Sequence, residues 1–250
     1  PDTWLYENHP EWLLKPTPNR EGGLAGMRSW SADELGGSDP CVSHNPTPHA
    51  RTVANIRWEP GQLSFHPGPK GEYSVVRFTA SETGAYDVGA MFTAIDQDTT
   101  TEVFVLQDGE PTFHGWVNLH GQEKKTGYDT ELTLTTGSVL DFVVGWGNGS
   151  HICDSTGLEI QLVSPSGKRF DAAKDFNADK NPYGPWSYGY LKAGDQPESE
   201  AFRPFGRPNR MSDEGMRLFN LGNPAARQWV TDHVDRMLTE EGIDLYRQDF

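Results

Sequence analysis

The chain has 250 residues and a formal net charge of -15, and its 27 glycines, 18 prolines and 8 tryptophans suit short strands joined by tight turns. The acidic excess repels a polyanion, so nucleic acid is not an expected partner. There is no apolar run of about eighteen residues or more, so we expect no membrane span and no membrane partner.

Residues 15–50 are rich in Pro, Gly, Asp and Ser but retain aromatic side chains such as Trp30. A free linker has no reason to carry such apolar surface, so we interpret this range as an ordered connection. It contains Cys41, which could form a disulfide with the other cysteine, Cys153, or remain a separate thiol. The sequence leaves both alternatives open.

Residues 51–163 alternate apolar and polar side chains with a period of two, which is typical of strands. The expected strands are 73–79, 85–92, 101–106, 131–135, 139–144 and 158–162. Turn signals such as the Asp108-Gly109 pair separate them at short intervals. This rhythm predicts an antiparallel β-sandwich, jelly-roll-like in form, as a module of its own. Residues 164–216 then form a second connection that carries further aromatic side chains.

Residues 217–250 change to a helical period. Asn223 can cap a helix that has Pro224 at its first position. One helical face is formed by apolar or bulky side chains: Ala226, Trp229, Val230, His233, Val234, Met237 and Leu238. Short apolar runs precede and follow the helix, so the order strand, helix, strand predicts a right-handed parallel crossover. One crossover cannot cover a sheet, so we expect it to belong to a longer parent protein.

Asp249 ends the second of these expected strands, where catalytic groups of parallel barrels project. A carboxylate at this place can attack an anomeric carbon or act as a base, and Arg247 would help to keep it ionised. The alternative is a strand-end aspartate that only caps the following turn.

The run from Leu218 to Val230, followed by Gly242-Ile-Asp-Leu-Tyr-Arg-Gln-Asp-Phe250, resembles the α-galactosidases of glycoside hydrolase family 36 and their melibiase relatives. Residues 1–14 resemble the stretch that precedes this run in those enzymes. The resemblance implies that 1–14 and 217–250 are segments of a partial (β/α)8 barrel. It also implies that Asp249 is the nucleophile of a retaining mechanism, with Arg247 in place of the usual lysine and Gln248 in place of the usual tryptophan.

A retaining glycosidase needs a second carboxyl group about 5 Å from the nucleophile. The resemblance implies that this acid/base comes from a later barrel strand, so we expect residues 1–250 alone to have no hydrolase activity. It also implies a bacterial enzyme that is secreted or periplasmic, with a targeting signal outside this chain and no required cofactor.

The sandwich separates the two barrel-like segments and therefore reads as an insertion. Its sequence is similar to carbohydrate-binding-like modules of bacterial polysaccharide-degrading enzymes. Sugars stack on flat aromatic faces, so we predict that surface aromatics form a binding platform. The candidates are Trp116, Trp146, Trp186 and Tyr188, with Tyr190 nearby; packing in the core is the alternative for each.

Acidic side chains close to the strand ends suggest a structural calcium ion, which takes six or more oxygen ligands. Asp96 and Asp98 are the proposed ligands, and Asp141 and Asp154 could join them. No complete calcium-loop motif is present.

Three hypotheses follow. The first is a fragment of an α-galactosidase-like hydrolase with an inserted carbohydrate-binding sandwich. The second is a non-catalytic sandwich that binds a glycan or another partner, and the third is a sandwich that serves only as a spacer.

Overall fold

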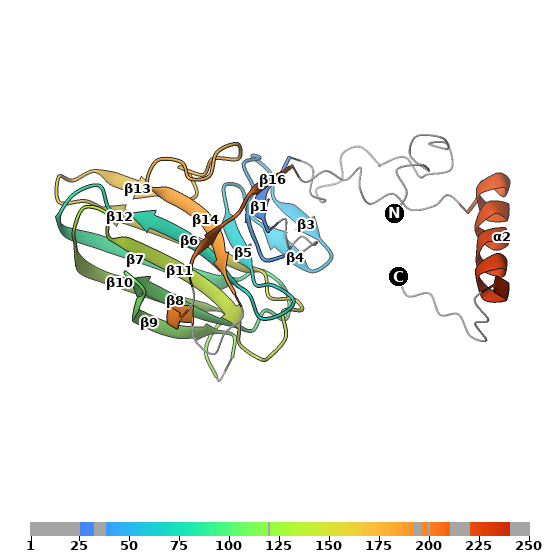
Figure 1. Cartoon of the computed structure of the whole chain (residues 1–250), viewed down its shortest axis with the longest axis horizontal. Coiled ribbons are helices and arrows are strands. Elements are labelled where there is room, and N and C mark those ends of the chain that lie inside the picture. Colours follow the sequence, from blue (N-terminus) through green and yellow to red (C-terminus); the bar gives the residue numbers. More distant parts are fainter. Residues whose placement is uncertain are drawn as a thin grey trace. The chain divides into compact units, whose positions relative to one another are not determined.

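The computed structural model describes residues 26–32, 39–119, 121–192, 197–199, 201–210 and 221–240. The chain divides into two compact units, which we describe separately. One is Glu21–Ser212, and the other combines Pro1–Arg20 with Asp213–Phe250. The first unit contains every described strand, and the described part of the second is one helix (Figure 1).

The first unit is an antiparallel β-sandwich. Its larger sheet has eight strands in the order β10-β7-β12-β5-β2-β1-β16, with β13 paired to β12. These strands are β1 (Arg28–Ser31), β2 (Cys41–His44), β5 (Leu63–His66), β7 (Gly84–Ala94), β10 (Lys125–Leu134), β12 (Thr156–Val163), β13 (Arg169–Asp171) and β16 (Arg207–Arg210).

The smaller sheet has six strands in the order β15-β14-β6-β11-β8-β9. They are β6 (Tyr73–Thr79), β8 (Thr101–Gln107), β9 (Glu110–Val117), β11 (Val139–Trp146), β14 (Trp186–Leu191) and β15 (Arg203–Pro204). A separate hairpin joins β3 (Arg51–Val53) to β4 (Ile56–Trp58), and a short 3-10 helix, η3, covers Pro197–Ser199.

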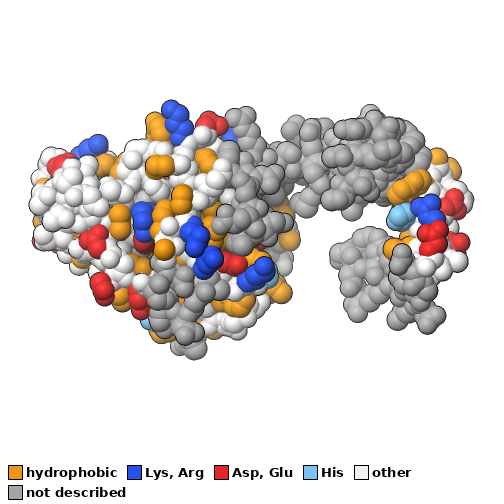
Figure 2. All heavy atoms as spheres, viewed as in Figure 1, with side chains coloured by type: hydrophobic (Ala, Val, Ile, Leu, Met, Phe, Trp, Pro, Cys, Tyr) orange, Lys and Arg blue, Asp and Glu red, His pale blue; other side chains and the backbone are white. Residues whose placement is uncertain are grey.

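The core consists of the facing sides of the two sheets. Alternate residues of each strand point inward, as on β7, where Tyr86, Val88 and Phe92 are almost fully buried. From the smaller sheet, Phe78 and Phe142 meet them. Figure 2 shows the outer surface, on which acidic, basic and scattered hydrophobic side chains are interspersed.

The predicted sandwich is confirmed. Five of the six strands expected from the alternation lie within an observed strand, and the sixth, 131–135, extends one residue past the end of β10. The predicted turn after β8 is confirmed as well: Asp108 and Gly109 have φ values of 51° and 91°, which is the pattern of a tight type I′ hairpin turn. β9 was not expected, because its sequence lacks a strong apolar alternation.

The sandwich is larger than the alternating region. Residues predicted as connections supply strands to both sheets: β1 and β2 lie in the larger sheet, and β14 pairs with β6 in the smaller one. The aromatic side chains that argued against a free linker are the inward-facing residues of these strands.

The described part of the second unit is helix α2 (Pro224–Glu240). Asn223 caps it as predicted, since its side-chain Oδ1 accepts a hydrogen bond from the backbone N of Ala225 at 2.9 Å. Ala226 is buried on the predicted apolar face, and Trp229 stacks on His233 with ring centres 5.0 Å apart. The expected flanking strands and residues 1–14 lie outside the described residues, so the partial barrel stays a prediction.

Candidate functional site

A groove runs along the outer face of the larger sheet, over β7 and β12. Three neighbouring hollows of about 320, 350 and 530 Å³ form it. The first two share Gly89, Asp129 and Gln161, and the last two share Glu159. Lining residues extend along β7 from Asp87 to Thr93. At a rise of about 3.3 Å per residue, the groove is therefore about 20 Å long.

The middle of the groove is set by strand register. Asp129 on β10 lies opposite Gly89 on β7, Gly89 lies opposite Gln161 on β12, and Gln161 lies opposite Asp171 on β13. The backbones of β10 and β12 flank β7 and are therefore about 10 Å apart. The carboxylate of Asp129 and the amide of Gln161 thus lie on either side of Gly89, which has no side chain.

Gly89 leaves bare backbone at the floor of the groove. A Cβ atom added there would meet only one atom within 4 Å, the backbone oxygen of Gln161 at 3.8 Å. Next to it, the space above Gly127 is filled by the Met91 side chain, which would lie 3.0 Å from an added Cβ. Glycine inside a strand often marks a place where a ligand approaches the backbone closely.

The polar groups of the groove are available to a ligand. Asp129, Glu159 and Gln161 are exposed, and within the described parts of the chain their side chains make no hydrogen bond or ion pair. Asp171 is instead held by Lys174, whose Nζ donates to its Oδ2 at 2.7 Å. Together these groups can accept and donate hydrogen bonds along the whole length of the groove.

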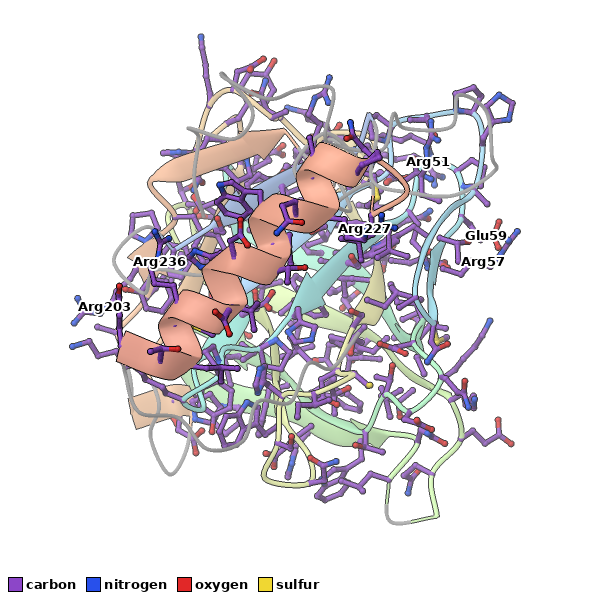
Figure 3. All side chains as sticks on the ribbon, turned by 90° about the vertical axis from the view of Figure 1, so that its right-hand side faces the viewer. Arg51, Arg57, Glu59, Arg203, Arg227 and Arg236 are labelled. Carbon is purple, nitrogen blue, oxygen red and sulfur yellow. The ribbon has the colours of Figure 1, made fainter. Side chains whose placement is uncertain are left out.

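One end of the groove, the hollow of about 530 Å³, is lined by β4 and by the segment that joins β4 to β5. Here Arg57 and Glu59 form an exposed ion pair, with Nε and Oε1 2.7 Å apart (Figure 3). Lys125 lines the same hollow from the start of β10. The groove therefore carries charges of both signs at this end and carboxylates in its middle.

Two of the predicted platform aromatics do not fit a stacking role. Trp186 and Tyr188 are 0% exposed because they lie on the inward face of β14. The Trp186 ring packs edge-on against Phe78, and its Nε1 donates to Asp175 at 3.1 Å. Tyr190 shares this face and is 2% exposed. Each of these three aromatics therefore packs in the core, which was the alternative to a place in a surface platform.

Because Trp186 is a core residue, we expect Trp186→Ala to lower the free energy of unfolding by about 3–5 kcal/mol through the cavity that it leaves. Urea unfolding followed by circular dichroism measures this change. A variant that keeps wild-type stability would contradict the core assignment.

Trp116 and Trp146 are both half-buried, and neither is among the residues that form the groove. Trp116, on β9 of the smaller sheet, lies against His114 with ring centres 4.4 Å apart. Trp146 ends β11, and its Nε1 donates to the backbone oxygen of Gly68 at 2.7 Å. The structure does not bring the four predicted aromatics together into one platform.

The four acidic residues considered for calcium separate into two groups. Asp141 accepts two hydrogen bonds from Arg77, which accounts for its buried charge. Asp96 and Asp154 are buried near each other, on the loops after β7 and before β12, while Asp98 is exposed on the first of these loops. In the described residues, no group of three or more acidic, histidine or cysteine side chains could hold a metal ion by itself.

Burial, and then the nearby carboxylate of Asp96, raise the pKa of Asp154 to about 7. Cys153 lies beside them with φ of 66°, and Cys41 is buried against Asp39. Both cysteines are free thiols, so of the two alternatives for this pair the structure shows the unpaired one.

Asp249 and Arg247 lie outside the described residues, so their predicted catalytic roles stay predictions. The sequence contains one signal for the groove, namely the glycines Gly89 and Gly127 inside strands. Asp129 and Gln161 gave no such signal in the sequence, because polar residues at alternate positions of a strand usually just face the solvent.

The fold and the groove define an antiparallel β-sandwich with a polar groove on one sheet. The chain matches no protein-family model and no curated protein. Among solved structures, it is similar to a crystal structure of a selenomethionine-labelled β-glucosidase from Kluyveromyces marxianus, with 15% identity and a TM-score of 0.24. The match covers 41% of this chain and 11% of that chain. A likeness this low carries no weight for fold or function.

Within the described residues, no helix has the length and apolar character needed to cross a membrane.

Proposed function

We propose that the sandwich binds a carbohydrate chain in the groove over β7 and β12, as part of a retaining glycoside hydrolase that acts on α-galactosides. The glycan-binding part of this proposal rests on one observation, the row formed by Asp129, Gly89 and Gln161. It places hydrogen-bonding groups on both sides of open backbone, in a groove long enough for several linked sugar rings.

The chemistry of the groove suits a neutral glycan. Sugar hydroxyl groups can donate to the Asp129 and Glu159 carboxylates and can both donate to and accept from the Gln161 amide. The bare backbone at Gly89 lets a ring approach closely, and Met91 offers an apolar surface beside it. Carboxylates in the middle of the groove would repel uronic acids or sulfated sugars, so we expect such polymers to bind less well.

The catalytic half rests on the resemblance of residues 1–14 and 217–250 to family 36 α-galactosidases. In this proposal the two segments belong to a (β/α)8 barrel, and Asp249 attacks the anomeric carbon of the substrate. A second carboxyl group from a later strand of the full-length protein supplies the acid/base. The sandwich would then hold the polymer while the barrel cleaves its α-galactosyl groups.

A second candidate is a sandwich that binds glycan without any associated chemistry. It is favoured by one observation: all residues of the groove belong to the unit Glu21–Ser212. Glycan binding therefore does not depend on whether the barrel proposal is correct.

Affinity electrophoresis of the 250-residue chain in gels that contain galactan or galactomannan tests the binding proposal. We expect retardation by at least one neutral polymer. The double variant Asp129→Ala/Gln161→Ala should weaken it by about tenfold or more, since a hydrogen bond to a charged group contributes about 1.5–3 kcal/mol.

Glu110→Ala is the matched control, because it removes an exposed carboxylate from the β8–β9 hairpin of the other sheet. It should migrate like the wild type. Retardation that is equal in the wild type and the double variant would place binding elsewhere, and no retardation on any polysaccharide would favour the spacer hypothesis.

A further inference from the structure

Asp154 has a buried carboxylate oxygen that no described group satisfies. The residue is 0% exposed, and its Oδ1 accepts a hydrogen bond from the backbone N of Thr100 at 3.1 Å. Its Oδ2 has no hydrogen-bond partner. A buried polar atom without a partner is costly, and an unseen water or ion is a common explanation.

The negative charges around the Asp154 Oδ2 atom favour a cation as its partner. Asp96 is only 8% exposed, and its negative charge acts on Asp154. Asp98 lies on the same loop as Asp96, and both act on the neighbouring thiol of Cys153. Among the described residues, neither Asp96 nor Asp154 forms an ion pair with a lysine, arginine or histidine. Two buried acidic groups therefore lie near each other, and neither is paired with a basic side chain of the described residues.

The two loops that carry these groups are already fixed to each other. The Thr99 hydroxyl donates to the backbone oxygen of Ser155 at 2.9 Å, and the backbone N of Ile95 donates to the same oxygen at 3.2 Å. The Asp96 Oδ1 accepts from the backbone N of Gln97 at 2.6 Å, which holds that carboxylate in place. The oxygens are thus positioned by the fold before any ion binds.

We propose that a divalent cation with the ligand preferences of calcium binds between Asp154 and Asp96 and joins the β7–β8 loop to the β11–β12 loop. Hard carboxylate oxygens are what calcium prefers, and it accepts irregular sites completed by backbone oxygens and water. This site is independent of the glycan groove.

Thermal unfolding of the 250-residue chain tests the site, in EGTA and with added calcium or magnesium. Calcium at about 100 times its Kd should raise the Tm by about 5–10 °C, and magnesium should raise it less. Calorimetric titration with calcium chloride should show one site per chain. A chain that shows neither heat of binding nor a Tm shift would overturn the proposal.

Asp154→Asn separates a metal ligand from a merely structural aspartate. As a ligand variant it should lose the calcium shift, yet in EGTA its Tm should equal or exceed that of the wild type, because the amide removes one of two repelling charges. Asp141→Asn is the matched control: it alters a buried aspartate that is paired with Arg77, so it should lower the Tm in both buffers and keep the calcium shift. A calcium shift retained by both Asp154→Asn and Asp96→Asn would contradict the assignment.

Discussion

Asp249→Asn in the full-length protein should lower turnover of an aryl α-galactoside by about 10⁴-fold or more and leave the fold intact. The amide cannot form the covalent glycosyl intermediate, and loss of a nucleophile removes most of the rate acceleration. Steady-state kinetics with circular dichroism as a folding control measures both parts of this prediction.

Two further variants sharpen the test. In Asp249→Gly, azide should restore release of the aryl group, because the anion can attack the anomeric carbon from the face that the carboxylate would have used. Asp244→Asn is the matched control, since it changes another aspartate of the same predicted strand at its opposite end and should keep turnover. If Asp249→Asn stays active, the nucleophile assignment is wrong, whereas the glycan-binding proposal is unaffected.

Arg77→Met should lower the free energy of unfolding by about 3–5 kcal/mol, because it leaves a buried charge without its partner. Arg77 and Asp141 lie opposite each other on β6 and β11, with Nε to Oδ1 2.6 Å and Nη2 to Oδ2 2.7 Å apart. The Asp141 side chain is only 4% exposed, and the Phe202 ring covers the guanidinium at 4.0 Å.

The pH dependence of this variant follows from the same contact. Burial raises the pKa of Asp141 above its usual value even with Arg77 beside it. Loss of the guanidinium raises that pKa further, so the folded state of the variant binds the proton more tightly than the unfolded chain does. The free energy of unfolding of the variant therefore falls as pH rises. The loss of stability caused by Arg77→Met should accordingly be smaller at pH 5 than at pH 7.

The double variant Arg77→Met/Asp141→Leu provides the control for this prediction, since it removes both charges. It should recover most of the lost stability, because a buried ion pair replaced by apolar groups is often close to neutral. Urea denaturation of the three proteins at both pH values tests the account. An Arg77→Met penalty below about 1 kcal/mol would show that the pair is effectively solvated.

The strands of the sandwich were predictable because their alternation is strong. On β7 and β12 apolar side chains alternate with polar or small ones, so the pattern shows directly which residues point inward. The strands outside 51–163 were missed, since β1, β2 and β14 lie among Pro, Gly and Asp residues. Their place in the sheets depends on pairing with distant strands, which local sequence does not encode.

The aromatic platform was misjudged for a related reason. A period of two shows that Trp186, Tyr188 and Tyr190 share one face of a strand, but it does not show whether another sheet covers that face. The three aromatics are the inward face of β14 and pack in the core. Their large apolar area makes burial the favoured position once a second sheet is present.

The groove could not be predicted because four different strands build its central row. Asp129, Gly89, Gln161 and Asp171 become one row only through the registers that join β10, β7, β12 and β13. A shift of one residue in any of these registers would turn the strand's polar set to the other face. Only the strand-interior glycine gave a local hint.

The most direct test of the central claim is an amide NMR titration of the isotope-labelled chain with a neutral galactan or galactomannan oligosaccharide. Glycan binding in the groove predicts that the amide signals of Gly89, Gly127, Asp129 and Gln161 shift together and saturate with one affinity. Shifts that gather instead around Trp116 or Trp146, or no shifts at millimolar ligand, would contradict it.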